Sequence, residues 1–295
     1  MKKMFLVFNP KSGRGEFIRN LYNVIELFSR AEYEVVAYPT SGTGDALACI
    51  QERGLGFDLI VCAGGDGIVN EAVNAYMKTK SLPLFGYIPS GTTNDFAVSL
   101  GLPLDMLEAA RTILKGQSRM IDIGKLGDQY FSYVAAFGQF TDIPYSTAQS
   151  AKNIFGRMAY LIEGIKHLVN ITNVECSIDI DGEIIEGSFL LGIITNSISV
   201  GGFKIQSDGN AAFDDGLFEV IFIRSPDTLV KQSELMAALA GTSPHSEMLI
   251  QRKTKKVIFN STKPCSWTVD GEFGGRYTEV AAQNIQKAIS IIVPE

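Results

Sequence analysis

The sequence of 295 residues has few of the side chains on which many metal and nucleophilic sites depend. It contains two histidines, so a histidine zinc site or a serine-histidine mechanism has little material to work with. Its four cysteines are scattered without paired spacing, and they read as reduced packing residues: Cys49, Cys62, Cys176 and Cys265. Any chemistry must therefore depend on carboxylates.

Long apolar runs and a surplus of positive charge are missing as well. No run of about 18 apolar residues is present, and the N-terminal Met-Lys-Lys leads at once into a short apolar segment, which is unlike a signal peptide. The formal net charge is -6 and the pI is about 5.1, which argues against a nucleic-acid partner. We expect a cytoplasmic protein that binds no nucleic acid.

The remaining composition is that of a globular protein, with 46% hydrophobic and 20% charged residues. Domains commonly hold roughly 100–200 residues, so two domains are expected. Residues 1–122 alternate short apolar runs with helical patterns, which predicts an α/β domain with a parallel sheet. Strands are expected at 5–8, 34–38, 59–62 and 84–88, and helices at about 16–31, 43–53, 68–79 and 104–115.

The pattern changes after Arg119, where longer alternating apolar runs are typical of antiparallel strands. A second, β-rich domain is expected over residues 123–285. Its strands are expected at 121–125, 130–137, 174–180, 189–194 and 218–223. Apolar residues recur at helical spacing over 150–170, which predicts a helix that packs a core or a domain seam.

Three glycine-rich segments of the first domain each follow an apolar strand. They are residues 9–15 (Asn-Pro-Lys-Ser-Gly-Arg-Gly), 64–67 (Gly-Gly-Asp-Gly) and 89–96 (Pro-Ser-Gly-Thr-Thr-Asn-Asp-Phe). Strand ends share one edge of a parallel sheet, so we expect the three loops to converge on one site. Taken singly, each segment has an alternative interpretation as a tight turn.

Phosphate binding fits this composition. Glycine lets backbone N–H groups approach phosphate oxygens, and a following helix N-terminus adds partial positive charge, as expected for Gly64, Gly65 and Gly67. Asp66 beside them requires a cation, which makes it a candidate for the magnesium environment. Charge and hydroxyl donors are available in the other two loops: Lys11, Arg14, Ser12, Thr92 and Thr93. The chain lacks both the Walker phosphate loop and a dinucleotide fingerprint in a strand-to-helix context.

As a set, these segments resemble the bacterial diacylglycerol kinases and related lipid kinases. The similarity covers residues 9–15, 64–71 and 91–97, and it extends to Asp-Asp-Gly-Leu at 214–217 and Asp-Gly-Glu at 270–272. The resemblance implies an N-terminal nucleotide-binding domain and a β-rich C-terminal domain that binds lipid and metal. It also implies a catalytic cleft between the domains and a terminal strand, 286–295, that rejoins the first.

The same resemblance implies roles for individual residues, with Mg²⁺ and ATP as the cofactor and co-substrate. A structural Mg²⁺ would be held by Asp215 and by backbone carbonyls near Ala212 and Leu217. Glu272 or Asp270 would be the base that acts on the lipid hydroxyl, and Asp66 would serve the reacting phosphates. The residues implied to contact ATP are Asn9, Lys11, Ser12, Thr40, Gly64, Gly65, Asp66, Gly67, Ile68, Val69, Asn70, Gly91, Thr92 and Asn94.

Two features depart from the family pattern. Ile68 stands where the family commonly has threonine, which removes a hydroxyl that could bind phosphate, and the segment 207–213 lacks the usual proline. Asp-Gly-Glu at 270–272 could also be a simple turn, since a second copy at 181–183 has the pattern of a hairpin turn. If Asp270 and Glu272 lie on one extended segment, both carboxylates point to the same face.

A dense basic cluster occurs late in the chain, at Arg252, Lys253, Lys255 and Lys256. One interpretation is a solvated edge strand whose lysines oppose aggregation. The alternative is contact with an anionic membrane surface.

We therefore expect a lipid kinase that transfers the ATP γ-phosphoryl group to the hydroxyl of a diacylglycerol-like lipid at a membrane surface. Peripheral membrane association is expected, and an oligomer is compatible with the sequence. The rival interpretations are an NAD kinase, which shares the Gly-Gly-Asp-Gly loop, and a catalytically silent regulator that binds lipid or nucleotide.

Overall fold

The computed structural model describes residues 1–138, 173–196, 199–200, 203–204, 213–239, 242–243 and 246–295. The chain divides into two compact units. Unit 1 comprises residues 1–123 and 286–295, and unit 2 comprises residues 124–285. The terminal segment that the resemblance assigns to the first domain thus lies in unit 1. The helix expected over 150–170 lies outside the described residues.

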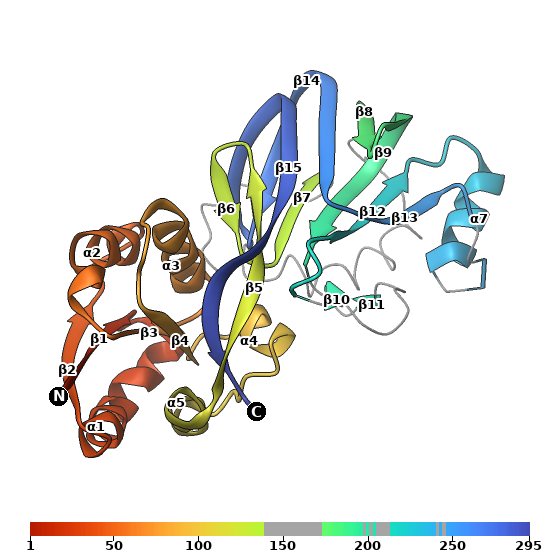
Figure 1. Ribbon diagram of the computed structural model, residues 1–295. Coiled ribbons are helices and arrows are strands. Elements are labelled where there is room, and N and C mark those ends of the chain that lie inside the picture. Colours follow the sequence, from red (N-terminus) through yellow and green to blue (C-terminus); the bar gives the residue numbers. More distant parts are fainter. Residues whose placement is uncertain (139–172, 197–198, 201–202, 205–212, 240–241, 244–245) are drawn as a thin grey trace. The chain divides into compact units, whose positions relative to one another are not determined.

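Unit 1 alternates strands and helices. Its elements are β1 (Lys2–Phe8), α1 (Glu16–Arg30), β2 (Tyr33–Pro39), α2 (Asp45–Arg53), β3 (Leu59–Gly64), α3 (Asp66–Lys78), β4 (Leu84–Pro89), α4 (Asp95–Ser99), α5 (Met106–Lys115) and the start of β5 (Gln117–Leu126). The first four strands pair in the order β4-β3-β1-β2, and every pairing is parallel. Figure 1 shows α1 and α5 on one face of these strands and α2 and α3 on the other.

The sequence explains this layering. The core of β1 is apolar without alternation because both of its faces are covered, and Met4 to Val7 are fully buried. One stripe of α1 is buried, at Phe17, Val24 and Phe28, which is the spacing of a helix that packs on a sheet. The Asp105 carboxylate accepts the Leu107 and Glu108 amides at 3.0 and 2.9 Å, so α5 begins two residues after the expected start at 104.

The last strand, β15 (Glu272–Val293), begins in unit 2 and ends in unit 1. Its Ile291 pairs with Phe85 of β4 in parallel. Where the strand enters unit 1, Lys287 has a φ of 51° and its amide donates to Asp122 Oδ1 at 2.8 Å. Asp122 is only 1% exposed, so its buried carboxylate holds β15 in place at Lys287.

Unit 2 is built mainly from antiparallel strands. Beyond the end of β5 it contains β6 (Gln129–Phe131), β7 (Val134–Gly138), β8 (Val174–Ile180), β9 (Glu183–Thr195), β10 (Ser199–Val200), β11 (Phe203–Lys204), β12 (Phe218–Arg224), α7 (Leu229–Leu239), β13 (Leu249–Thr254), β14 (Lys256–Val269) and the start of β15. Strands β8, β9, β7 and β14 pair in a closed circuit. Phe137, Phe259 and Trp267 pack in its core with ring centroids between 4.8 and 5.3 Å apart.

Two expectations about the strands and helices need correction. The single strand expected over 130–137 is two strands, β6 and β7, because the Ser132 and Tyr133 amides leave the ladder to bind the Asp270 carboxylate. Helices α4 and α7 were not expected, since α4 is too short to show periodicity and α7 has a weak apolar stripe. Across the described ranges, no helix combines the length and hydropathy needed to span a membrane.

Candidate functional site

The three glycine-rich loops meet at the carboxyl ends of β1, β3 and β4. We call residues 9–15 loop 1, residues 64–67 loop 2 and residues 89–96 loop 3. The Ser12 hydroxyl donates to the Ser90 carbonyl at 2.9 Å, which joins loop 1 to loop 3. The Ser90 amide donates to the Gly64 carbonyl at 2.8 Å, which joins loop 3 to loop 2. The convergence expected from the sequence is therefore confirmed.

Loops 2 and 3 touch through two glycines. A Cβ atom on Gly91 would lie 2.5 Å from the Cα of Gly65 and 2.8 Å from Asn94 Oδ1. Gly13 is restricted in the same way, because its φ is 53° and a Cβ there would lie 2.3 Å from the Ser90 carbonyl oxygen. These glycines are required by the approach of one backbone to another.

Several residues expected to contact ATP instead bind within the loops. The Asn94 side chain accepts the Gly91 amide at 2.9 Å and donates to the Gly91 carbonyl at 3.0 Å, so it closes loop 3. Asn9 Oδ1 accepts the Lys11 amide at 2.9 Å. Ser12 is 8% exposed, because its hydroxyl is the tie to loop 3. These side chains shape the loops, and their contact with a nucleotide stays a prediction.

Other expected residues are presented to solvent. Lys11, Gly67 and Thr92 are exposed, and a Cβ on Gly67 would meet nothing within 4 Å. The Thr40 amide donates to the Phe8 carbonyl at 2.8 Å, which fixes Thr40 at the end of β1. A cation, two hydroxyls and an open stretch of backbone are thus available at this edge of unit 1.

Two neighbouring carboxylates belong to loops 2 and 3. Asp66 opens α3, and its Oδ1 accepts the Phe96 amide of α4 at 3.1 Å. Burial, and next the nearby Asp66 carboxylate, raises the pKa of Asp95 to about 6. A hard cation would relieve this repulsion, so the donor set fits Mg²⁺. Asp95 lies in the motif at 89–96 but was given no role, because its burial depends on contacts distant in sequence.

Glu71 is a second residue whose role the sequence did not show. Its carboxylate accepts the amides of Gly44 at 2.8 Å, Ala46 at 2.9 Å and Leu47 at 3.3 Å. Glu71 lies on α3, so it caps α2 from a neighbouring helix and ties down the segment that follows Thr40. The N-terminus of α3 itself has no side-chain cap, since Gly65 occupies that position.

The structure limits how residues 68–70 can contact a nucleotide. Ile68 and Val69 are 6% and 0% exposed, so their side chains belong to the core. Ile68 packs on Gly64, where a Cβ would lie 2.7 Å from the Ile68 Cγ2. Asn70 Oδ1 accepts the Asn74 side chain at 3.2 Å. Isoleucine in place of threonine is thus compatible with the packing, and any nucleotide contact at 68 and 69 must use the backbone.

In unit 2, Asp270 and Gly271 form the turn of the β14–β15 hairpin. Their φ angles are 47° and 84°, and Val269 pairs with Glu272 across the turn. Asp270 and Glu272 therefore do not lie on one extended segment, because the chain reverses between them, and the turn interpretation of this Asp-Gly-Glu copy holds.

Asp270 is a buried anchor at this turn. It is 4% exposed, and its carboxylate accepts the Ser132 amide at 2.7 Å, the Ser132 hydroxyl at 2.9 Å and the Tyr133 and Val134 amides at 3.0 and 3.1 Å. Four donors therefore surround the two carboxylate oxygens. This geometry suits a residue that positions the turn more than one that collects a proton.

The earlier Asp-Gly-Glu copy has the same turn with different surroundings. Asp181 and Gly182 have φ angles of 53° and 90°, and Ile180 pairs with Glu183. Asp181 is exposed, and its Oδ1 accepts the Thr254 hydroxyl at 2.9 Å. The two copies, which the sequence could not separate, therefore differ in the burial of the aspartate, while Glu272 and Glu183 are both exposed.

Asp215 lies in the turn before β12. Its Oδ1 accepts the Leu217 amide at 2.9 Å, and its side chain is 27% exposed. Ala212, the other expected backbone ligand, lies outside the described residues. A carboxylate oxygen is a ligand that suits Mg²⁺.

Lys253 also lies at this turn, and it is exposed on β13, which agrees with the edge-strand interpretation of the basic cluster. Its Nζ lies 3.2 Å from Glu219 Oε1 and 3.8 Å from Asp215 Oδ2. Burial raises the pKa of Glu219, and Lys253 opposes that shift. Lys253 lies on β13, which is at the end of the sheet order. Lys256 lies on the next strand, β14, so the basic cluster is divided between two strands.

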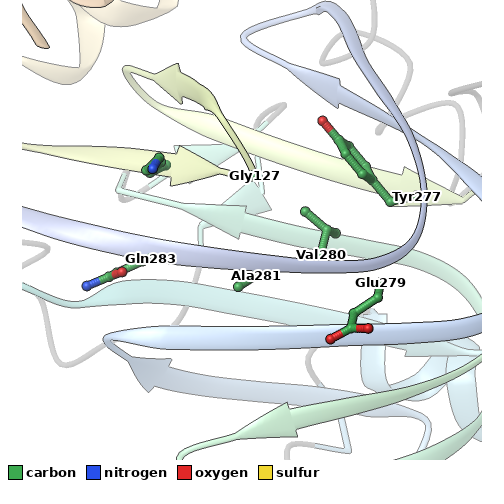
Figure 2. A pocket seen from close by; sticks show the side chains of 7 residues that line it. Gly127, Tyr277, Glu279, Val280, Ala281 and Gln283 are labelled. Atoms are coloured by element: carbon green, nitrogen blue, oxygen red, sulfur yellow. The ribbon is translucent and has the colours of Figure 1, made fainter. Parts of the chain in front are cut away.

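A pocket of about 440 Å³ lies along β15 in unit 2 (Figure 2). Its lining comes from the β5–β6 hairpin and from β15: Lys125, Gly127, Tyr277, Glu279, Val280, Ala281 and Gln283. None of the residues expected to bind ATP, metal or the lipid hydroxyl lines this pocket.

Comparisons with known proteins agree with this arrangement. Residues 3–126 match the family model of the diacylglycerol kinase catalytic domain, and residues 143–293 match that of the YegS C-terminal NAD kinase beta sandwich-like domain. A diacylglycerol kinase of Bacillus subtilis (strain 168) is 35% identical over 298 residues, which cover 100% of this chain and 97% of that protein. One of Staphylococcus carnosus (strain TM300) is 34% identical over 299 residues, which cover 100% and 96%.

Solved structures give the same result. The crystal structure of a diacylglycerol kinase from Bacillus anthracis str. Sterne superimposes with a TM-score of 0.80 at 26% sequence identity, covering 99% of this chain and 97% of that chain. From the two family models and the full-length similarity to these relatives, the chain belongs to the diacylglycerol kinase family.

Proposed function

We propose that this chain transfers the γ-phosphoryl group of ATP to the hydroxyl of a diacylglycerol-like lipid. The observation that supports this most strongly is the meeting of loops 1, 2 and 3 beside Asp66 and Asp95, in a chain that belongs to a lipid kinase family. Phosphoryl transfer depends mainly on positioning and on electrostatic stabilisation of the phosphates, which such an edge can supply.

In the proposed complex, unit 1 binds ATP. Backbone N–H groups of Gly65 and Gly67 and the uncapped start of α3 would contact phosphate oxygens. Lys11 would add positive charge, and Thr40 and Thr92 would donate hydroxyl groups. Ser12, Asn94 and Glu71 would act indirectly by holding the loops that carry these donors.

Mg²⁺ would enter the proposed complex in two places. Asp66, with Asp95 beside it, would face the cation that accompanies ATP, and that cation would offset negative charge on the phosphates. Asp215 would hold a structural Mg²⁺ together with backbone carbonyls near Ala212 and Leu217.

Glu272 is the proposed base. It would accept the proton of the lipid hydroxyl as the oxygen forms its bond to the γ-phosphorus and the bond between that phosphorus and the bridging oxygen of ADP breaks. Asp270 would position Glu272 by anchoring the turn that precedes it.

The lipid would be met at a membrane surface. Arg252, Lys255 and Lys256 are exposed, and each could contribute about 1 kcal/mol near an anionic bilayer. We therefore extend the proposal to peripheral association with anionic membranes.

The function is tested by incubating the full chain with ATP and Mg²⁺ in three separate reactions, which contain a total lipid extract, diacylglycerol in mixed micelles, or NAD. We expect lipid products heavier by one HPO₃ unit, about 80 Da by mass spectrometry, and no phosphorylated NAD. Phosphorylation of NAD alone would support an NAD kinase. Binding of ATP with no product in any reaction would support a silent regulator.

Glu71→Gln should raise the KM for ATP by about 3- to 10-fold and leave kcat within about twofold. The glutamine loses the charge and one of the two acceptor oxygens that hold α2. Hydrogen bonds to charged groups are worth about 1.5–3 kcal/mol, and only part of this loss would affect the position of Thr40 and hence the binding of ATP. Steady-state kinetics measure the change. Glu52→Gln, at an exposed position of α2, is the matched control, and equal kinetics in the two variants would contradict the positioning role.

Glu272→Gln should reduce turnover by roughly 10²–10⁴-fold with ATP affinity nearly unchanged, because the amide keeps the size of the side chain and cannot take the proton. Glu183→Gln, at the same position of the other hairpin, should keep full activity.

Asp270→Asn should lower the free energy of unfolding by about 1–3 kcal/mol, since it disturbs a buried carboxylate with four donors.

Turnover in a lipid kinase assay, calorimetry with ATP and urea denaturation followed by Trp267 fluorescence provide the three readouts. A fully active Glu272→Gln would remove Glu272 from the mechanism. If Asp270→Asn were inactive but fully stable, the role of base would pass to Asp270.

A further inference from the structure

One lysine of unit 2 lies between two carboxylates of very different burial. Lys253 on β13 pairs in register with Glu219 on β12, and Asp215 lies in the turn that leads into β12. The lysine Nζ is 3.2 Å from Glu219 Oε1 and 3.8 Å from Asp215 Oδ2. The side chains of Glu219, Asp215 and Lys253 are 3%, 27% and 36% exposed, so the contact lies at the boundary between core and surface.

The two contacts are unequal for a physical reason. A buried carboxylate requires a counter-charge, and Lys253 supplies it to Glu219 at the shorter distance. The more exposed Asp215 keeps water on one side and shares the ammonium only at 3.8 Å. One oxygen of Asp215 is already held by the Leu217 amide, so the ammonium reaches the other oxygen.

We propose that Lys253 is an internal counter-cation of the Asp215 turn that competes with Mg²⁺ and sets the affinity of this site for the metal. The inference rests on the proposed Mg²⁺ site at Asp215. An ammonium this close repels an incoming cation and shares its ligand oxygen, so Mg²⁺ must displace Lys253 toward Glu219. Without metal, Lys253 holds the turn in place; with metal, Glu219 retains Lys253. Lys253 is therefore a positioning residue of the metal site.

The proposal makes two substitutions act in opposite directions. Lys253→Met removes the competing cation from Asp215, so Mg²⁺ should bind more tightly. Glu219→Gln releases Lys253 to pair with Asp215, so Mg²⁺ should bind more weakly. If these residues merely supported the turn, both substitutions would loosen it and both would weaken binding.

The test is isothermal calorimetry of the full chain with MgCl₂, after removal of metal by chelation and without nucleotide or lipid. Melting temperatures at the same Mg²⁺ concentrations give a second readout, because a metal that binds only the folded state stabilises it. Lys253→Met should lower the Kd for Mg²⁺ by about tenfold, and Glu219→Gln should raise it by about tenfold, the lower end of the usual effect of residues behind metal ligands. Lys255→Met, at an exposed residue of the same basic cluster, should match the parent.

Asp215→Ala shows which part of the heat of Mg²⁺ binding comes from this site, because the variant lacks the proposed ligand. If Asp215→Ala binds Mg²⁺ like the parent, the proposed metal site itself is wrong. If the parent binds Mg²⁺ through Asp215 but Lys253→Met is unchanged or weaker, the competition is wrong and the metal site stands. Should Lys253→Met fail to fold, Lys253→Gln, which removes the charge and keeps a polar side chain, takes its place. Unchanged or weaker Mg²⁺ binding in Lys253→Gln would overturn the proposal.

Discussion

The candidate site depends on the close approach of three backbone loops at one edge of a parallel sheet. Loops 2 and 3 meet at Gly65 and Gly91 with no room for a side chain, and Ser12 and Ser90 tie loop 1 to the same point. A parallel sheet brings the strand ends together, but only glycine permits this degree of contact. The polar side chains of the loops either close their own loop, as Asn9 and Asn94 do, or tie one loop to another, as Ser12 and Asp66 do. Backbone donors and the exposed Lys11 and Thr92 are then available at the edge.

Carboxylates in this protein divide into anchors and groups that are presented to solvent. Asp270, Glu71 and Asp122 each accept backbone amides from segments distant in sequence. In each case the charged carboxylate supplies an acceptor that these backbone N–H groups would otherwise lack. Glu272 is exposed beside one such anchor. Asp215 has an intermediate position, since one oxygen serves its own turn and the other lies near a lysine. The chemistry that we propose depends on this division, because a buried anchor fixes the backbone that carries the exposed group.

The sequence was sufficient to predict the alternating strands and helices of unit 1, their parallel pairing and the convergence of the three loops. These features follow from local periodicity and from the rule that parallel strands end at one edge. The roles of Asp270, Glu71 and Lys253 could not be predicted in this way. Asp270 meets Ser132 across 138 residues of sequence, and no local pattern records which of two Asp-Gly-Glu turns is buried. Ile68 is a related case, since its packing on Gly64 becomes visible only when α3 is placed against β3.

The central claim is that contact between glycine loops builds the phosphate site, and the affinity of Gly91→Ala for Mg·ATP, measured by calorimetry, tests it most directly. The added methyl group would lie 2.5 Å from the Gly65 Cα and must push loop 3 away from loop 2. We predict that the affinity falls by about tenfold or more, with Gly42→Ala unchanged because a Cβ there meets nothing within 4 Å. A folded Gly91→Ala that binds Mg·ATP as tightly as the parent would contradict the account.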